Sequence, residues 1–564
     1  MVGSSLNCAK WVPDNPDCQK EGKFTCKNCH LVVYCGASCQ KAHWAQHKVD
    51  CKTALNNSTW LPAWAREDRM PAFLGGLPLV SLGMNKYLWG NVPAFDLIQL
   101  EKNEGLGYTG DLRLLFAASG DLRNVVKTIS RIPPEYGDTL EITVNDRDFD
   151  IVGRNVILLL IALSIEDKDE AIDCMIHLWY SALVRESDLQ LIQRRIRTRI
   201  QNVCKTIENN KLDGPAAKTW RFGDRSLRLV LEAPSWNRLL SFFDVPTGLK
   251  AERAQEIRRA VTLAEAREDY YDRFLYCQSP AHRLAHQKFR EEGLLLPFGL
   301  SSHEFCVPNP TLYQNTLYWT MNDNADPLHG WPSDEVAALS TGPATADLYG
   351  KLFFYLRKTF EDFLVRLRGS KVSFTLYQHD VTSLVEQLDT GTFSRIEVSN
   401  ISDAHWFGIH RTLNAFVPFL QHPKDNPHAT LVTLFMNAIA ETLDKDKFYD
   451  LPRRSLHTTR RVLRYIPLDQ PPISPYDPRV IKFNMGMRIA STYDTTFDQY
   501  MSDMRFHEAG AFFGAAMKDR HTIIAKWPFQ LQLRPGQPGA QEKFERRMGD
   551  GMSGKERYVE WRRR

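Results

Sequence analysis

Long apolar segments are missing from this chain of 564 residues. The longest mainly apolar run, Val156–Ile165, has about half of the ~20 residues that a membrane-spanning helix needs. The sequence also does not open on the charged and then apolar stretch that makes a signal peptide. From these two absences we expect no membrane contact and a location inside the cell, in the cytoplasm or the nucleus.

The chain also lacks a clear excess of positive or negative charge. The chain has 71 Lys and Arg residues against 67 Asp and Glu residues, so its net charge is only +4. Proteins that bind nucleic acid through its phosphates usually carry a clear excess of positive charge. Nucleic acid is therefore not indicated as a partner. The composition, 43% hydrophobic and 24% charged, is that of a globular chain with two or three folding units.

Two common catalytic motifs are also absent. The chain contains no Gly-x-x-x-x-Gly-Lys-Ser/Thr loop, which cradles nucleotide phosphates in P-loop enzymes. It contains no Gly-x-Ser-x-Gly turn, which carries the nucleophile of α/β-hydrolases. The motifs therefore give no reason to place the chain in either enzyme class.

Cysteine is abundant only in the first 51 residues, which hold seven of the eleven. The other four, Cys174, Cys204, Cys277 and Cys306, are scattered, and we expect them to be buried free thiols. A disulfide framework does not fit an odd cysteine count in a chain without a signal peptide. A zinc site needs four thiolate or imidazole ligands, and short spacings supply them readily. Seven cysteines and one histidine therefore predict two complete zinc sites.

A short helix is expected over Gln40–Cys51. It puts His47 and Cys51 four residues apart on one face, as shared ligands of one metal require. His43 lies on the same face and is the alternative histidine ligand.

The segment from Tyr34 to Cys51 closely resembles the MYND zinc finger, including the Tyr before the fifth ligand and the Gln and Trp between the sixth and seventh. The resemblance implies two interleaved sites that share eight ligands and gives the histidine role to His47. The first site would use Cys8, Cys18, Cys35 and Cys39, and the second Cys26, Cys29, His47 and Cys51. One departure from the family pattern is the spacing of Cys8 and Cys18, which enclose nine residues where the family usually has two.

The same resemblance implies a binding role. MYND fingers bind short Pro-rich segments through a shallow aromatic groove, and the matching positions in this chain are Gln40 and Trp44. A Pro-rich peptide is already extended and loses little entropy on docking. The alternative for Trp44 is that it only fills the small core between the two zinc ions. The function that we expect first is a protein-interaction adaptor that contacts its partner through the finger.

Beyond the finger, short apolar runs alternate with helical patterns and predict an α/β core. We expect strands at Leu112–Ala118, Glu141–Val144, Val372–Tyr377, Arg395–Val398 and Ala429–Phe435. The helices between them, such as Phe149–Leu163, predict a parallel sheet covered on both faces. Segments such as Ser187–Asn209 and Ala251–Gln278 are charged and helical in period. They predict a helical insertion that lies outside the sheet.

This arrangement resembles the methyltransferase variant of the Rossmann fold, a doubly wound sheet, in which the first strand lies beside the fourth. The resemblance implies that strand ends bind the cofactor, and Gly120, Asp146, Asp380 and Asn400 occupy those positions. A methyltransferase that uses S-adenosylmethionine is therefore the alternative function. Asp146 can instead form a turn and Asp380 can cap a helix, and the first turn has a single glycine.

The stretch from Met84 to Leu183, which includes the characteristic segment Tyr87–Leu97, raises a second resemblance. It is similar to a domain of unknown function that follows MYND fingers in many fungal proteins and is related to the amino-terminal region of axonemal dynein assembly factors. The resemblance implies an intracellular zinc-binding protein with a Rossmann-like core and no established reaction. The lysine-methylating proteins that carry MYND fingers are not indicated, because the Asn-His-x-Cys stretch of their SET domain is absent.

The chain is therefore expected to have seven parts. They are a zinc finger (1–55), a linker (56–83), the first half of the Rossmann-like domain (84–185), the helical insertion (186–348), the second half of that domain (349–470), C-terminal helices with an edge strand at 521–527 (471–534), and a flexible basic tail (535–564).

Overall fold

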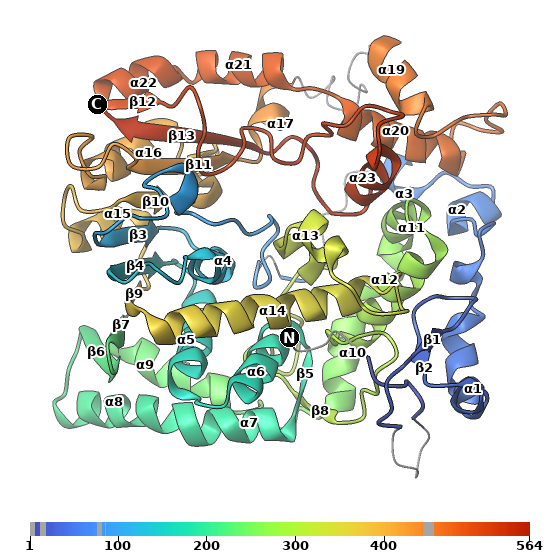
Figure 1. Cartoon of the computed structure of the whole chain (residues 1–564), viewed down its shortest axis with the longest axis horizontal. Coiled ribbons are helices and arrows are strands. Elements are labelled where there is room, and N and C mark those ends of the chain that lie inside the picture. Colours follow the sequence, from blue (N-terminus) through green and yellow to red (C-terminus); the bar gives the residue numbers. More distant parts are fainter. Residues whose placement is uncertain (1–5, 12–17, 76–81, 85, 444–455) are drawn as a thin grey trace.

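A nine-stranded mixed β-sheet runs through the computed structural model, which describes residues 6–11, 18–75, 82–84, 86–443 and 456–564. The strand order is β12-β13-β11-β10-β3-β4-β9-β7-β6, from the top of the molecule to the lower left (Figure 1). The strands span Leu112–Phe116 (β3), Thr139–Asn145 (β4), Pro215–Phe222 (β6), Arg225–Glu232 (β7), Lys371–Tyr377 (β9), Arg395–Glu397 (β10), Thr430–Phe435 (β11), Ala515–Met517 (β12) and Arg557–Arg563 (β13).

The five strands expected from the sequence are parallel neighbours in this sheet, in the order β11-β10-β3-β4-β9. The first of them in the chain, β3, lies beside the fourth, β10, with Leu114 opposite Arg395. The predicted neighbour relation is confirmed. The carboxyl ends of these parallel strands lie at one edge of the sheet, where the proposed cofactor residues follow them.

Helices cover both faces of the sheet because alternate residues of its central strands point to opposite sides. In β3, Leu114 and Phe116 belong to one buried cluster and Leu115 to another. The first cluster includes residues of α4 (Arg123–Arg131), α5 (Phe149–Ser164), α6 (Lys168–Tyr180) and α14 (Leu348–Gly369). The second includes residues of α15 (Val381–Leu384), α16 (Ile409–Phe416), α17 (Ala438–Thr442), α21 (Asp494–Asp503) and α22 (Phe506–Phe512).

The expectation that the insertion lies outside the sheet is wrong. Strands β6 and β7 form a hairpin around Gly223 and Asp224, and β7 pairs in parallel with β9. Leu227, Leu229 and Leu231 are buried at every second position, as in a strand with one face on the core. The residues between these leucines are Arg228 and Val230, so the sequence itself carries this alternation.

The rest of the insertion is mainly helical. Its helices are α7 (Glu186–Ile192), α8 (Thr198–Asn209), α9 (Ala233–Leu239), α10 (Ala251–Thr262), α11 (Glu268–Tyr276), α12 (Pro280–Glu292) and α13 (Ser333–Ala338). A small antiparallel sheet joins β5 (Leu183–Arg185) to β8 (Phe305–Pro308).

The expectation of a flexible tail is also wrong. Residues 540–547 form α23 (Ala540–Arg547), and β13 lies between β11 and β12, antiparallel to both. The predicted edge strand at 521–527 does not form, and β12 takes the sheet edge instead. The physical reason is Glu560 of β13, whose buried carboxylate accepts hydrogen bonds from the backbone amides of residues 522, 523 and 524. Two further helices, α19 (Leu456–Leu463) and α20 (Pro478–Ala490), complete this region.

The zinc finger region, dark blue at the right of Figure 1, packs on the insertion. It has two short strands, β1 (Phe24–Thr25) and β2 (Val33–Tyr34), and one helix, α1 (Ala37–Cys51). A side chain at Gly299 would come within 2.9 Å of the Ala9 Cβ atom, so the two regions are in close contact. Arg283 of α12 donates to the carbonyl oxygens of Leu55 and Asn57 at 3.4 and 3.1 Å. The finger is thus held against the body by packing and hydrogen bonds.

Two short helices, α2 (Ala63–Arg66) and α3 (Ala72–Gly75), lie in the expected linker. Within the described ranges, no helix is both long and apolar enough to cross a membrane.

Candidate metal centre

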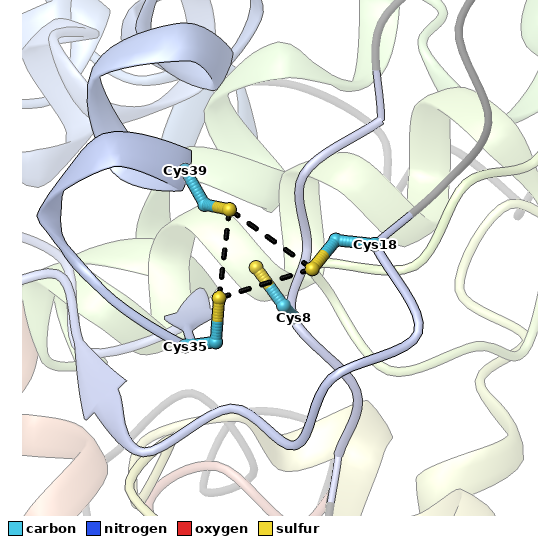
Figure 2. Close-up of side chains that lie close together, drawn as sticks. All are labelled: Cys8, Cys18, Cys35 and Cys39. Atoms are coloured by element: carbon cyan, nitrogen blue, oxygen red, sulfur yellow. Dashed lines mark hydrogen bonds between the residues drawn. The ribbon is translucent and has the colours of Figure 1, made fainter.

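Four cysteines from separate parts of the finger converge on one point (Figure 2). Cys8 and Cys18 come from the first segment, Cys35 follows β2, and Cys39 lies in the first turn of α1. Their thiol groups point toward one another, and the four sulfur atoms lie within 4.8 Å of each other. The long spacing between Cys8 and Cys18 does not prevent this, because the amide of Cys8 bonds to the Lys20 carbonyl at 2.8 Å and brings the two segments together.

The sulfur separations fit a zinc ion. Tetrahedral coordination at a Zn–S distance of about 2.3 Å puts ligand sulfurs about 3.8 Å apart. The observed Sγ–Sγ distances are 3.8 Å for Cys18 and Cys35, 3.5 Å for Cys35 and Cys39, and 4.0 Å for Cys18 and Cys39. Unbonded thiols have no reason to gather at this spacing, so the donor set suits Zn²⁺ in both type and separation.

The second group consists of Cys26, Cys29, His47 and Cys51, all buried. The Sγ atoms of Cys26 and Cys51 are 3.8 Å apart, and the Sγ of Cys29 is 3.6 Å from the Nε2 of His47. A thiolate and an imidazole nitrogen on one tetrahedral zinc would be about 3.6 Å apart, since the Zn–N bond is shorter. The finger thus holds two Cys/His zinc-binding sites, and together they would take two Zn²⁺.

His43 lies outside both groups. Its Nδ1 is 3.1 Å from the hydroxyl of Tyr34, and its ring stacks on that of His47 with centroids 6.2 Å apart. Burial lowers the pKa of His43 to about 4, so the ring is neutral at physiological pH. Its position is that of a packing residue between Tyr34 and the zinc ligand His47.

Asn28 supports the second site in a way that the sequence analysis missed. Its Nδ2 donates to the Sγ of Cys51 at 3.2 Å and to the Cys51 carbonyl at 3.0 Å. An N–H bond to a metal thiolate reduces charge on the sulfur and fixes its orientation. The local signal was the place of Asn28 between Cys26 and Cys29, in the turn that presents two ligands.

Comparison with known proteins agrees with this geometry. Residues 15–51 match the MYND finger family. Cys8 lies before the matched segment, although its sulfur joins the first group. MYND fingers mediate protein interactions.

The region after the MYND finger matches a domain of unknown function (DUF4470) over residues 88–184. Residues of this chain are also similar to dynein axonemal assembly factor 3 of Danio rerio, with 32% identity over 80 residues. That match covers 14% of this chain and 16% of the relative. No solved structure matches the chain. The expected order of finger and following domain is confirmed, and the fungal context stays a prediction.

Gln40 and Trp44 lie one turn apart on α1. Trp44 is 36% exposed, and the edge of its ring contacts His47 with centroids 5.8 Å apart. Gln40 is half-buried. Trp44 therefore packs against a zinc ligand and still presents part of its indole at the surface, so it is not only a filler of the space between the two sites.

The predicted cofactor residues make hydrogen bonds to other residues of the chain. The amide of Gly120 donates to the carboxylate of Asp146 at 3.0 Å, and the other oxygen of Asp146 accepts from the Asp148 amide at 2.9 Å. Burial raises the pKa of Asp146. The turn after β3 and the end of β4 are thus joined directly by two of the predicted cofactor residues themselves.

The other two positions also make structural contacts. Asp380 is exposed and caps α15, accepting from the amide and the hydroxyl of Thr382 at 3.0 and 2.9 Å. Asn400 donates to Asp403 at 3.4 Å.

The side-chain amide of Asn145 donates to the carbonyls of Ala117 and His379 and so ties three strand ends together. The sequence signal for it was its place at the end of a predicted strand.

Asp121 follows the single glycine of the first turn. Its buried carboxylate forms an ion pair with Arg123 at 2.6 Å and accepts from the indole of Trp179 at 3.3 Å. This turn is filled by protein side chains.

Proposed function

We propose that the protein is an adaptor that docks a partner peptide on the exposed face of α1, with Gln40 and Trp44 at the centre. The observation that carries the proposal is the partly exposed indole of Trp44, which packs against the buried ring of His47. Because the zinc ion would hold His47, the aromatic platform is rigid without help from a partner. A rigid aromatic surface suits an extended Pro-rich segment, which docks with little loss of entropy.

The polar groups of this face are available to a ligand. Within the part of the chain that the structure describes, the side-chain amide of Gln40 and the indole N–H of Trp44 make no hydrogen bond. Backbone carbonyls in a Pro-rich peptide cannot pair with neighbouring prolines, which lack an N–H, and they are free to accept such bonds. The platform therefore offers one donor from the indole and a donor and an acceptor from the amide.

The charge around the platform indicates acidic flanks on the peptide. Lys41, Lys48 and Lys52 are exposed on or just after α1, and the Lys52 ammonium lies 5.7 Å from the centroid of the Trp44 ring. Opposite charge at the rim of an interface speeds association and favours the matching partner. We propose a Pro-rich segment with Asp or Glu beside it as the ligand class.

A binding experiment with the zinc-loaded full chain tests the proposal. A fluorescein-labelled hexaproline peptide with two aspartates at each end is titrated and followed by fluorescence polarisation. We expect saturable binding that Trp44→Ala weakens by at least about tenfold, as for an anchor residue of an interface. Gln40→Ala should weaken it by a smaller factor, because a neutral hydrogen bond contributes less.

The matched control is Phe24→Ala, since Phe24 is 62% exposed on β1 of the same finger and should not affect the peptide. Zinc content is measured for each variant. Equal binding by the wild type and Trp44→Ala, at equal zinc content, contradicts the proposal, and so does the absence of saturable binding by the wild type.

For the core, we propose a Rossmann-like scaffold role. The order of the five parallel strands supports this class, because it follows the 3-2-1-4-5 part of the Rossmann order. The S-adenosylmethionine alternative has this order in its favour and the hydrogen bond between Gly120 and Asp146 against it. The similarity to a protein named as an assembly factor fits an adaptor better than an enzyme.

A further inference from the structure

A second candidate site is a cavity of about 450 Å³, lined by residues that lie far from Gln40 and Trp44 in the sequence. Its walls come from α11, α12, the loop at 86–91, the segment at 321–329 and the segment at 551–556 that precedes β13. Its volume is in the range of natural small-molecule sites, which hold about 300–1,000 Å³. The cavity thus lies where several distant parts of the chain meet, as ligand sites often do.

Aromatic and sulfur-containing side chains supply much of the lining. Tyr270, Tyr271 and Phe274 project from α11, and Trp89 lies in the loop at 86–91. Tyr271 and Phe274 are stacked, with ring centroids 6.3 Å apart. Four methionines, Met321, Met436, Met485 and Met552, also line the cavity. These flat and polarisable surfaces suit a planar ring.

Arg273 gives the cavity a cation without an anionic partner. Its guanidinium carbon lies 4.6 Å from the ring centroid of Phe73 and 5.8 Å from that of Tyr270. Among the residues that the structure describes, its side chain makes no ion pair and no hydrogen bond. Two other cations of the lining, Lys86 and Arg267, are paired with Asp148 and Asp323. A further cation of the lining, Arg290, donates to the backbone carbonyls of Asp323 and Thr262. Arg273, which makes no such bond to the described residues, is the cation best placed to bind an incoming anion, in the fork geometry that suits phosphate.

Neutral polar groups of the lining are unpaired too. In the described part of the chain, the side-chain amides of Asn91 and Asn322 make no hydrogen bond, and the hydroxyl of Tyr271 has no partner. Glu556 uses its Oε1 for the amide and hydroxyl of Ser553, while its buried Oε2 has no donor. Buried polar groups are normally paired, so the unpaired hydroxyl of Tyr271 and Oε2 of Glu556 in one cavity need a cause. A ligand with acceptors and an N–H donor would satisfy them.

We propose that this cavity binds a mononucleotide, with its phosphate at Arg273 and its base against the aromatic residues of α11. A nucleobase combines a flat ring with N–H donors and ring acceptors, and the phosphate supplies the anion. The proposal is independent of the adaptor role of the finger. It also differs from the predicted cofactor site, since Gly120, Asp146, Asp380 and Asn400 do not line this cavity.

Calorimetric titration of the full chain with AMP, adenosine and inorganic phosphate tests the proposal. Because the site has both a ring surface and a cation, AMP should bind at least about tenfold more tightly than either adenosine or phosphate. Thermal unfolding should shift upward with AMP concentration, since a ligand that binds only the folded state stabilises it. No AMP binding at millimolar concentration overturns the proposal, and so does equal affinity for AMP and adenosine.

Two variants locate the site. Arg273→Gln should weaken AMP by at least about tenfold and leave adenosine nearly unchanged. Arg488→Gln is the matched control, because Arg488 is an exposed arginine near Arg273 that does not line the cavity. Unchanged AMP affinity in Arg273→Gln, or an equal loss in Arg488→Gln, would place any binding elsewhere. If Arg273→Gln does not fold, the three wild-type titrations still decide the matter.

Discussion

Replacing His43 and His47 separately gives the sharpest test of the metal centre. Both rings are buried on the same helix, four residues apart, and only His47 reaches a group of cysteines. In His47→Ala the second site loses one of four ligands. Because structural zinc supplies about 10–16 kcal/mol of apparent binding free energy in zinc-finger peptides, the loss should empty the site and unfold this half of the finger.

His43→Ala should have a much smaller effect. It removes the partner of the Tyr34 hydroxyl, and Tyr34 is 1% exposed. A buried hydroxyl left without a partner costs about 1–3 kcal/mol, which weakens the finger without removing a ligand. We therefore expect two zinc ions per chain in His43→Ala and one in His47→Ala.

The assay is elemental analysis of dialysed protein, scaled to protein concentration. Cys306→Ser serves as a control, because Cys306 lies outside both groups and its loss should leave two zinc ions. The expectation that Cys306 is buried is wrong, since its thiol is exposed, whereas Cys174, Cys204 and Cys277 are buried as expected. One zinc ion in His43→Ala, or two in His47→Ala, would refute the ligand assignment. A wild-type chain with fewer than two would refute the two-site reasoning as a whole.

Three further results are expected. S-adenosylmethionine at millimolar concentration should give no saturable calorimetric signal; a signal that Asp146→Ala abolishes would contradict the closed turn at Gly120. Burial raises the pKa of Glu397 from 4.5 to about 7. The folded state therefore binds this proton more tightly than the unfolded state, and the free energy of unfolding falls as the pH rises from about 4.5 to about 7. Glu397→Gln carries no such charge and should stabilise the fold at pH 8 by up to about 3 kcal/mol in urea unfolding. An unchanged midpoint would refute this. Deleting residues 557–564 should lower the thermal midpoint sharply and expose β11, whereas a truly flexible tail would leave the midpoint unchanged.

The zinc ligands could be predicted from sequence because short spacings determine most of the geometry. Cys26 and Cys29 share one turn, and His47 and Cys51 share one helix face, so local structure alone brings each pair together. The neighbour relation of β3 and β10 was predictable from the resemblance to the Rossmann fold, although about 280 residues separate the two strands. For the ligand pairs, the decisive pattern lies within a short stretch of residues.

The failures share a different cause. Glu560 is a buried carboxylate in the middle of β13, and its charge is compensated by Lys518 at 2.9 Å and by three amides from the preceding loop. These partners lie about 40 residues before Glu560 in the sequence, so the segment around Glu560 has the pattern of a polar tail. The hairpin β6-β7 was missed for a related reason, because β9, the strand that β7 pairs with, lies about 140 residues later in the sequence.

The position of β13 has a consequence for how the chain folds. Strand β11 ends at residue 435, and its neighbour β13 begins at residue 557, about 120 residues later. At a synthesis rate of about 5–20 residues per second, β11 leaves the ribosome roughly 6–24 seconds before the strand that covers its open side. During that time its unpaired amides and carbonyls form an edge that other strands can join. A nascent chain of this protein should therefore need protection from aggregation until β13 has been made, even though its parallel strands are already present.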